Sequence, residues 1–556
     1  MMDELWYRNA IIYSLDLETF MDANGDGVGD FQGLSERLDY LHALGVDVIW
    51  LAPFQPTPNR DNGYDVCDYY GVDHRHGSSG DFAEFMYEAN RRGLRVLMDL
   101  VINHTSNQHP WFEAARRDAQ SEYRSWYHWS KKRPAGWNKG MVFPGVQKAV
   151  WTKDDIAGEY YFHRFYEFQP DLNMGNARVR AELRRVMGYW LNQGVAGFRI
   201  DALPFVLELP KQPGRPKRRL CYEYMRELRT FAQQRRGDVL LLAEANVTPD
   251  EDEKYFGEHD DGMHMIFNFF VNQHLFESLA TGKVAPLRDA LRQTATIPES
   301  GQWAHFLRNH DELDLGRLSE ETRAAVFEEF GPDPKMHLYD RGLRRRLASM
   351  LGDRRRIELA YSMMFALPGT PVLRYGDEIG MGEDLSLSER AAVRTPMQWS
   401  DEKNGGFSSA DSLVHPVISS GPFGFERINV ESQWRDPDSL LNWMTRMIRL
   451  RKRCPAIGRG RWSVLRSHHP HVFVMHYEWR GTRLVTVHNF SRRQASVRFR
   501  VPEDDRVPLV DLLSNLRIEC GEDGRYELAL PAYGYRWFRI GNLGPAPRNP
   551  APDEKP

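Results

Sequence analysis

Residues 94–104 read LRVLMDLVINH, and this stretch decides how the first half of the chain is interpreted. Its first eight residues are mostly apolar or β-branched, which predicts a short strand buried on both faces. The run then passes directly into the polar residues Asn103 and His104. Buried strands that end in polar side chains are typical of parallel sheets, whose functional groups gather at the carboxyl ends of the strands.

The same pattern, an apolar run followed by polar residues, recurs along the chain. Three further runs end in clusters with carboxylates: GFRIDA at 197–202, LAEAN at 242–246 and FLRNHDE at 306–312. Between the runs lie stretches with apolar residues at helical spacing, such as 34–44 and 179–193. This alternation, from residue 10 to about 380, predicts an α/β fold: a closed (β/α)₈ TIM barrel rather than an open sheet.

Two segments interrupt the alternation and a third follows it. Residues 104–172, rich in Trp, Tyr, His and Lys, predict an inserted subdomain after strand three. Residues 313–353 are a charged insertion, interpreted either as a lid or as a solvated pair of helices. The catalytic barrel is then assigned to residues 1–103 and 173–455. The short alternating strands of residues 456–541 predict a C-terminal antiparallel β-sandwich.

Composition excludes several classes of protein. A net charge of −4 with 27% charged residues gives no basic surplus, so we expect no nucleic-acid partner. Four widely spaced cysteines argue against a thiol metal site or a disulfide framework. With no signal-peptide core and no bilayer-length apolar run, we predict a cytoplasmic protein with no membrane partner. Residues 542–556, rich in Pro and charge, predict a disordered tail, and a homo-oligomer is left open.

Two strand-end carboxylates, Asp201 and Glu244, match the needs of glycoside hydrolysis. One carboxyl group must protonate the leaving oxygen, and an ionised second one must attack or stabilise the anomeric carbon. Arg199 would keep Asp201 charged by lowering its pKa. Glu244 would need a pKa raised by burial and neighbouring negative charge to act as an acid near neutrality. A single carboxylate at a strand end is more often a helix cap or an ion-pair partner than a nucleophile, but the ordered set favours a catalytic pair.

Taken in order, the four strand-end motifs resemble the hallmark regions of the α-amylase superfamily, glycoside hydrolase family 13, over nearly the whole chain. The resemblance implies the barrel, the subdomain after strand three and the C-terminal sandwich. It also implies a retaining mechanism with Asp201 as nucleophile, Glu244 as general acid/base and Asp311 as third carboxylate. Residues implied to bind the substrate sugar are Asp61, Tyr64, His104, Gln169, Arg199, His310 and Arg394.

The loop at residues 22–30, DANGDGVGD, alternates oxygen-bearing residues with small ones. A short loop wraps a hard cation in this way, although an ordinary Asx-rich turn has the same composition. The family resemblance implies structural Ca²⁺ here, bound by Asp22, Asn24, Asp26, the Val28 carbonyl and Asp30. A second Ca²⁺ site implied by the resemblance uses Asn103, Asp171, Glu208 and the carbonyls of Phe205 and Val206. No organic cofactor is expected.

Within the family, several stretches resemble the trehalose synthase branch. They include HPWF at 109–112, FQPDLN at 168–173 and VRTPMQW at 393–399. The resemblance implies that Asp201 takes glucose from maltose and that the freed glucose then attacks to form trehalose. Small α-glucosides such as maltose and trehalose are therefore the expected substrates.

Three places depart from that branch: Arg374, the stretch 383–392 and the stretch 208–221. We expect all three on the acceptor side of the barrel mouth, so the acceptor of the glucosyl group stays open. The alternative is an α-glucosidase or transglucosidase that passes glucose to water or to another alcohol. A non-catalytic sugar-binding protein is disfavoured by the complete set of carboxylates.

Overall fold

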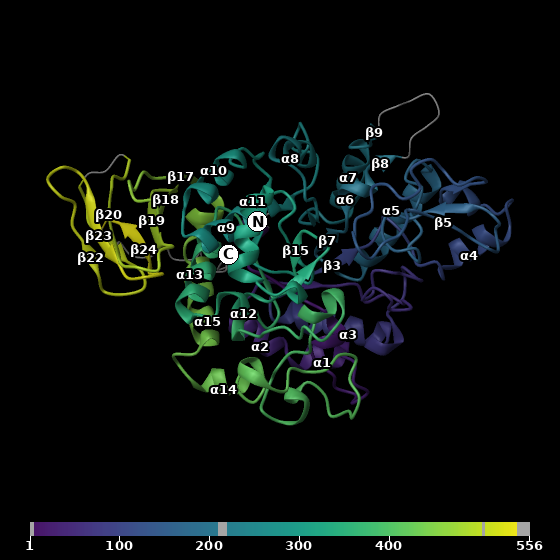
Figure 1. The fold of residues 1–556 in the computed structure, drawn as a ribbon, viewed down its shortest axis with the longest axis horizontal. Coiled ribbons are helices and arrows are strands. Elements are labelled where there is room, and N and C mark those ends of the chain that lie inside the picture. Colours follow the sequence, from purple (N-terminus) through teal and green to yellow (C-terminus); the bar gives the residue numbers. More distant parts are fainter. Residues whose placement is uncertain (1–4, 210–218, 503–505, 542–556) are drawn as a thin grey trace, which may run out of the picture.

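The computed structural model describes residues 5–209, 219–502 and 506–541 (Figure 1). Within these residues, eight parallel strands close into a barrel, in the order β1-β2-β3-β7-β10-β11-β12-β16 and back to β1. The strands are β1 Ile12–Leu15, β2 Val48–Leu51, β3 Arg95–Leu100, β7 Gly197–Ile200, β10 Leu240–Ala243, β11 Met265–Phe267, β12 Gln302–Phe306 and β16 Thr370–Arg374. The predicted (β/α)₈ barrel is confirmed.

Large apolar side chains from the strands form one buried cluster in the barrel. They include Ile12, Trp50, Leu97, Leu242 and Phe267. Alternate residues of a barrel strand point inward and the others face the helices, so both faces are buried. The strands therefore read as continuous apolar runs in the sequence.

Helices surround the barrel. They are α1 Phe31–Glu36, α2 Leu38–Leu44, α3 Ser79–Arg91, α5 Ala177–Asn192, α7 Glu223–Arg235, α8 Pro249–Phe256, α9 Phe269–Thr281, α10 Ala285–Gln293, α13 Arg354–Ala366 and α15 Leu440–Lys452, with short α6 Leu203–Val206, α12 Leu347–Leu351, α14 Val430–Arg435 and α16 Pro455–Arg459. Ser78 and Asp81 form a capping box that starts α3, and Gly45 ends α2 at φ +96°. Among the described helices, none is both long and apolar enough to cross a membrane.

The two interrupting segments have small sheets of their own. Residues 104–172 carry α4 Pro110–Arg117 and the antiparallel sheet of β4 Trp129–Ser130, β6 Tyr160–Phe162 and β5 Trp151–Lys153, seen at the right of Figure 1. Residues 313–353 carry α11 Glu320–Phe330 and a sheet of β13 Leu313–Asp314, β15 Gly342–Leu343 and β14 His337–Leu338. Helix α11 packs on α9 of the barrel, which anchors the charged insertion to it.

The C-terminal part is antiparallel, as predicted, and lies at the left of Figure 1. One sheet is β17 Arg461–Val464, β18 Val472–Trp479, β19 Thr482–Asn489, β24 Tyr535–Ile540, β21 Leu509–Asp511 and β22 Arg517–Ile518, and the other is β20 Ala495–Phe499 with β23 Tyr526–Leu530. Val474 and Val487 of the first sheet pack with Val497 and Leu528 of the second in one core. The predicted disordered tail, 542–556, lies outside the described residues.

Element boundaries differ from the predictions in places. The alternation of strands and helices was expected to start at residue 10, and its first strand begins at Ile12. The single helix predicted over 34–44 is two helices, because Arg37 leaves helical geometry at φ −99° and ψ 3°. Strands β11 and β16 are not predicted as strands at all: β11 has only three residues and β16 contains Pro371, which weakens a strand pattern.

Candidate active site

Side chains from four strand ends meet at one opening of the barrel. A parallel barrel places the carboxyl ends of all its strands at the same opening, so residues far apart in the sequence become neighbours. The strands concerned are β3, β7, β10 and β12. They supply Asp99, Arg199, Asp201, Glu244, His310 and Asp311 in chain order.

Arg199 joins three carboxylates through one guanidinium group. Its Nη1 lies 2.6 Å from Asp99 Oδ1 and 2.5 Å from Asp201 Oδ1, and its Nη2 lies 2.8 Å from Glu244 Oε2. Arg199 is only 1% exposed. Charge-assisted bonds of this kind are strong and directional, so the arginine fixes the orientation of both predicted catalytic carboxylates.

The two carboxylates differ in pKa. Burial raises the pKa of Asp201 to about 6, with Arg199 acting against the rise. Burial raises the pKa of Glu244 further, to about 7, again against Arg199 and helped by the charges of Asp201 and Asp311. Arg199 thus has the predicted effect on Asp201, but burial outweighs it. Near neutral pH the first group is the more readily ionised and the second keeps its proton more readily.

The backbone after Asp201 contributes to this arrangement. Ala202 has a left-handed conformation, at φ 48° and ψ 37°, which costs a non-glycine residue roughly 1–3 kcal/mol. In this conformation its N–H donates a hydrogen bond of 3.0 Å to Glu244 Oε2. The turn therefore ties the strand end of Asp201 to the carboxylate on the neighbouring strand.

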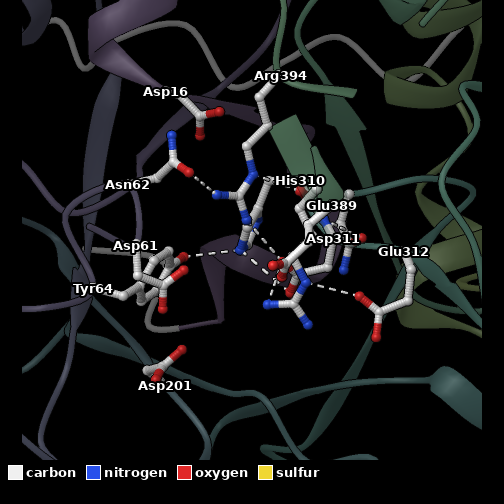
Figure 2. A network of polar contacts seen from close by, with 12 residues as sticks. Asp16, Asp61, Asn62, Tyr64, Asp201, His310, Asp311, Glu312, Glu389 and Arg394 are labelled. Atoms are coloured by element: carbon white, nitrogen blue, oxygen red, sulfur yellow. Dashed lines mark hydrogen bonds and ion pairs between the residues drawn. The ribbon is translucent and has the colours of Figure 1, made fainter. Parts of the chain in front are cut away.

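Asp311 is held by two arginines (Figure 2). Arg394 Nη2 lies 2.9 Å from its Oδ1. Arg390 Nη1 lies 3.0 Å from the same oxygen. Burial opposes ionisation, but the two guanidinium groups and His310 hold the pKa of Asp311 well below its usual range. His310 stacks on Tyr64, with ring centroids 5.6 Å apart, and its Nε2 lies 2.9 Å from the Tyr64 hydroxyl.

The remaining predicted sugar-binding residues lie in the same region. Gln169 Nε2 donates a hydrogen bond of 2.8 Å to Asp61 Oδ2, and burial raises the pKa of Asp61 to about 6. His104 Nε2 lies 2.9 Å from the carbonyl oxygen of Tyr64. Burial lowers the pKa of His104 to about 4, so its imidazole is neutral near pH 7.

These side chains surround a cavity of about 730 Å³. This volume is typical of small-molecule sites. Its walls include the predicted Asp61, Tyr64, His104, Asp201, Glu244, His310 and Asp311, and beside them Phe143, Phe165, Phe205, Asn246, Asp314, Arg341 and Arg390. Three predicted residues, Gln169, Arg199 and Arg394, are not among the described wall residues. Each of them contacts a carboxylate that does line the cavity.

Sequence reasoning missed the contacts that join three segments at the rim of this cavity. The hydroxyls of Tyr166 and Tyr339 donate hydrogen bonds of 2.6 and 2.7 Å to Glu389 Oε2. Arg341 Nη1 donates a hydrogen bond of 2.8 Å to the Val142 carbonyl. The inserted segment 104–172, the charged insertion 313–353 and the loop around residue 389 therefore meet there.

Three further polar residues near the site were also missed. Asp99 accepts hydrogen bonds from Arg199 and from the Tyr64 hydroxyl, and its place at the end of β3 was the signal that could have found it. Asn62 accepts a hydrogen bond of 2.5 Å from Arg394 (Figure 2). Arg390 lies in the stretch 383–392, which the sequence marks only as a departure from the trehalose synthase branch. No local pattern singles out Arg390 itself.

Arg374 does not line the cavity, contrary to the expectation that it lies on the acceptor side. It is 1% exposed and its Nη1 lies 3.0 Å from Asp16 Oδ1, at the end of β1. A guanidinium group cut off from water needs an anionic partner, and Asp16 provides one. Burial opposes the ionisation of Asp16, but the pair brings its pKa down to about 2. Most of the departing stretch 208–221 falls on residues 210–218, outside those described.

The predicted Ca²⁺ loop at residues 22–30 folds around two buried carboxylates. Asp22 accepts hydrogen bonds from the N–H groups of Gly25 and Gly27, at 2.7 and 2.8 Å. Asp30 accepts one of 3.1 Å from the N–H of Ala23. The oxygen atoms of this loop are the type of ligand that a hard cation such as Ca²⁺ prefers. However, no three His, Cys, Asp or Glu side chains in the described part of the chain are gathered closely enough to hold a metal, so Ca²⁺ stays a prediction.

The second predicted Ca²⁺ site holds an arginine. Arg164 Nη2 lies 3.0 Å from Glu208 Oε2, and the Arg164 N–H donates a hydrogen bond of 2.8 Å to Asp171 Oδ1. Asn103 Nδ2 lies 3.3 Å from a ring nitrogen of the adjacent His104. A fixed positive charge beside Glu208 opposes a divalent cation there, so these residues fit Ca²⁺ poorly.

In this (β/α)₈ barrel, the strand ends bring an aspartate and a glutamate onto one arginine beside a sugar-sized cavity. This arrangement defines the class of enzymes that act on glycosides. The family described as "Alpha amylase, catalytic domain" matches residues 14–327 and 342–460. The family "Sucrose hydrolase-like, C-terminal domain" matches residues 481–539. The chain belongs to the α-amylase family, glycoside hydrolase family 13.

Individual relatives point to one branch of the family. The chain is 40% identical to a trehalose synthase of Thermus thermophilus over 99% of its own length, and it spans 57% of that relative. It is 39% identical to the trehalose synthase of Pimelobacter sp. (strain R48), with 96% of each chain covered. The solved isomaltulose synthase from Klebsiella sp. LX3 superposes with a TM-score of 0.77 at 26% identity, covering 96% of this chain and 99% of that one. The chain is thus a trehalose synthase-like family 13 enzyme.

Proposed function

We propose that this enzyme interconverts maltose and trehalose through a covalent glucosyl intermediate on Asp201. The observation that carries the proposal is the placement of Asp201 and Glu244 on one buried guanidinium group beside a cavity of about 730 Å³. The similarity to trehalose synthases supports maltose and trehalose as the substrates.

In the first step, the Asp201 carboxylate attacks the anomeric carbon of the terminal glucose of maltose. Glu244 donates its proton to the glycosidic oxygen, so the bond to the second glucose breaks and that sugar leaves neutral. Arg199 stays bonded to both carboxylates, which keeps them oriented while charge moves between them. Asp311, held ionised by Arg390 and Arg394, accepts hydrogen bonds from the hydroxyls of the reacting glucose in this proposal.

In the second step, the freed glucose turns within the cavity and presents its anomeric hydroxyl to the intermediate. Glu244, now ionised, takes the proton of that hydroxyl as the oxygen attacks the anomeric carbon, and the bond to Asp201 breaks. Water must be kept out during this interval. The contacts of Tyr166 and Tyr339 with Glu389 at the rim support such closure.

The test is a product analysis of the purified full chain with maltose, and separately with trehalose. We expect each disaccharide to form the other, with free glucose as a minor product. Asp201→Asn is expected to reduce turnover by roughly a thousandfold or more, because the nucleophile is lost. Conversion of maltose mainly to glucose would overturn the proposal in favour of an α-glucosidase.

A further inference from the structure

A second cavity, of about 650 Å³, lies at the opposite end of the barrel from the catalytic site. Its walls come from η1 Trp6–Asn9 before β1, from the first residues of β12, from Pro368 before β16 and from β17, the first strand of the C-terminal sheet. Figure 1 shows β17 beside α10 where the barrel meets the C-terminal sheets. Because the strands are parallel, residues that precede or begin them lie at the end away from Asp201.

We call this second cavity the junction cavity, and the charged side chains among its described wall residues are all positive. The side chains that line it include Arg8, Arg292 and Arg461, and none of the described wall residues carries a carboxylate. Arg292 has a partner in Asp289, 3.6 Å away on the same helix, but more than half of each side chain is exposed, so this pair is weak. Three guanidinium groups around one cavity, in a chain with net charge −4, are a local concentration of positive charge.

One of these arginines is incompletely bonded. The Nε–H of Arg8 is buried and has no hydrogen-bond partner in the part of the chain that the structure describes. A buried donor without an acceptor carries the full cost of its lost hydration. The carboxylates whose charges act on Arg8 include Glu299 and Asp260. Asp260 already accepts a hydrogen bond from the Ser300 N–H at 2.9 Å, and Glu299 is exposed.

The cavity's backbone walls are fixed in place. Gln302 Nε2 donates hydrogen bonds to the carbonyls of Gly458 at 2.8 Å and of Arg8 at 3.3 Å, which ties the start of β12 to α16 and η1. Trp303 Nε1 donates a hydrogen bond of 2.8 Å to the Thr294 carbonyl. The arginines therefore extend from a rigid frame, which lowers the entropy that a ligand must overcome.

We propose that this junction cavity binds a small phosphate-bearing anion, held by Arg8 and Arg461 with Arg292 at its edge. Guanidinium groups bind phosphate oxygens through paired, charge-assisted hydrogen bonds, and no carboxylate among the described wall residues competes with the ligand for them. Inorganic phosphate, a sugar phosphate and a nucleotide share this chemistry, and the volume holds each of them. The bound anion would bridge the barrel to the C-terminal sheet without touching the catalytic carboxylates.

The experiment titrates the full chain by calorimetry with inorganic phosphate, glucose 1-phosphate and ATP in separate arms. Each titration is repeated with potassium chloride of the same ionic strength in place of the phosphate ligand, because screening by salt acts on any charged surface. We expect saturable binding of at least one phosphate ligand, with affinity at least about tenfold lower in Arg8→Gln and in Arg461→Gln. The arm that binds most tightly identifies the source of the phosphate group.

Arg355→Gln is the matched control, since this substitution removes the same charge from an exposed position outside the cavity. It is expected to bind phosphate ligands as the unchanged chain does. Arg461 is exposed, so its substitution leaves the fold intact even if Arg8→Gln does not fold. The proposal is overturned if no arm shows saturable binding, or if Arg461→Gln binds as tightly as Arg355→Gln.

Discussion

Arg199 shows how one buried side chain can set the state of two others. It donates to Asp201 and Glu244 from a position that is 1% exposed. Burial favours the neutral form of both carboxylates and the arginine favours the charged form, so the pKa of each reflects a balance. The balance differs between the two groups, and a retaining mechanism needs that difference.

The pH dependence of turnover follows from this difference. Asp201 must be ionised, so activity should fall as the pH drops below its pKa of about 6. Glu244 must be protonated, so activity should fall as the pH rises above its pKa of about 7. We expect a narrow bell for kcat/KM on maltose, whose limbs belong to the coupled pair rather than to either group alone.

Glu244→Gln provides the check on the alkaline limb. With an activated α-glucoside, whose leaving group needs no proton, this variant should form the intermediate without loss of rate at high pH. An alkaline limb that stays in the variant would assign that ionisation to another group.

At the scale of elements, the cavity is closed by segments that belong to no barrel strand. Tyr339 and Arg341 come from the turn between β14 and β15, while Tyr166 comes from the segment after β6. The two tyrosines meet at Glu389, in the short helix η7 Glu389–Val393. Two hydroxyls on one carboxylate make a small bridge across the rim, and its strength is that of two charge-assisted hydrogen bonds.

Breaking this bridge should shift the enzyme from isomerisation toward hydrolysis. In Tyr339→Phe the ring stays against Phe143, but the hydrogen bond to Glu389 is lost. We expect the ratio of glucose to trehalose formed from maltose to rise roughly three- to tenfold, as for the loss of about 1 kcal/mol of closure. Arg323→Ala on α11 is the control and should leave the ratio unchanged, while an equal rise in both variants would contradict the role of the rim.

The loop at residues 22–30 allows a prediction about metal binding. If it holds Ca²⁺, millimolar Ca²⁺ should raise the unfolding temperature of chelator-treated protein, because a ligand at a hundred times its Kd stabilises by about 2.7 kcal/mol. Asp26 is an exposed side chain in the loop, so Asp26→Asn should abolish the Ca²⁺ response with little effect on the metal-free protein. Differential scanning calorimetry measures both, and an unfolding temperature indifferent to Ca²⁺ would count against the site.

At the scale of the whole molecule, the C-terminal sheets are joined to the barrel by buried polar contacts. Trp537 of β24 donates a hydrogen bond of 3.0 Å to the Ser362 hydroxyl on α13. His488 of β19 bonds the same hydroxyl at 3.0 Å. Buried donors and acceptors that satisfy each other across a junction make separation of the two parts costly.

Trp537→Ala should therefore destabilise the whole chain. Trp537 is 1% exposed, and removing a buried tryptophan side chain costs about 3–5 kcal/mol. We expect a lower unfolding temperature and a C-terminal part that unfolds before the barrel, seen as a second calorimetric transition. Trp434→Ala, at a position 44% exposed, should shift the unfolding temperature far less. Similar shifts in the two variants would show that the junction contributes little.

The sequence by itself determined the barrel and the polar residues at four of its strand ends, although it left the strands β11 and β16 unpredicted. It could do so because hydrophobic periodicity is local, and because a parallel barrel brings all carboxyl ends of its strands together. Asp201 and Glu244 were singled out in this way, and the family resemblance added Asp311. Only the tertiary structure decided which side chains Arg199 joins, how burial outweighs its charge at Asp201, and that Arg374 pairs with Asp16 away from the cavity. Those outcomes depend on distances and burial between residues remote in the chain, and no local pattern encodes them.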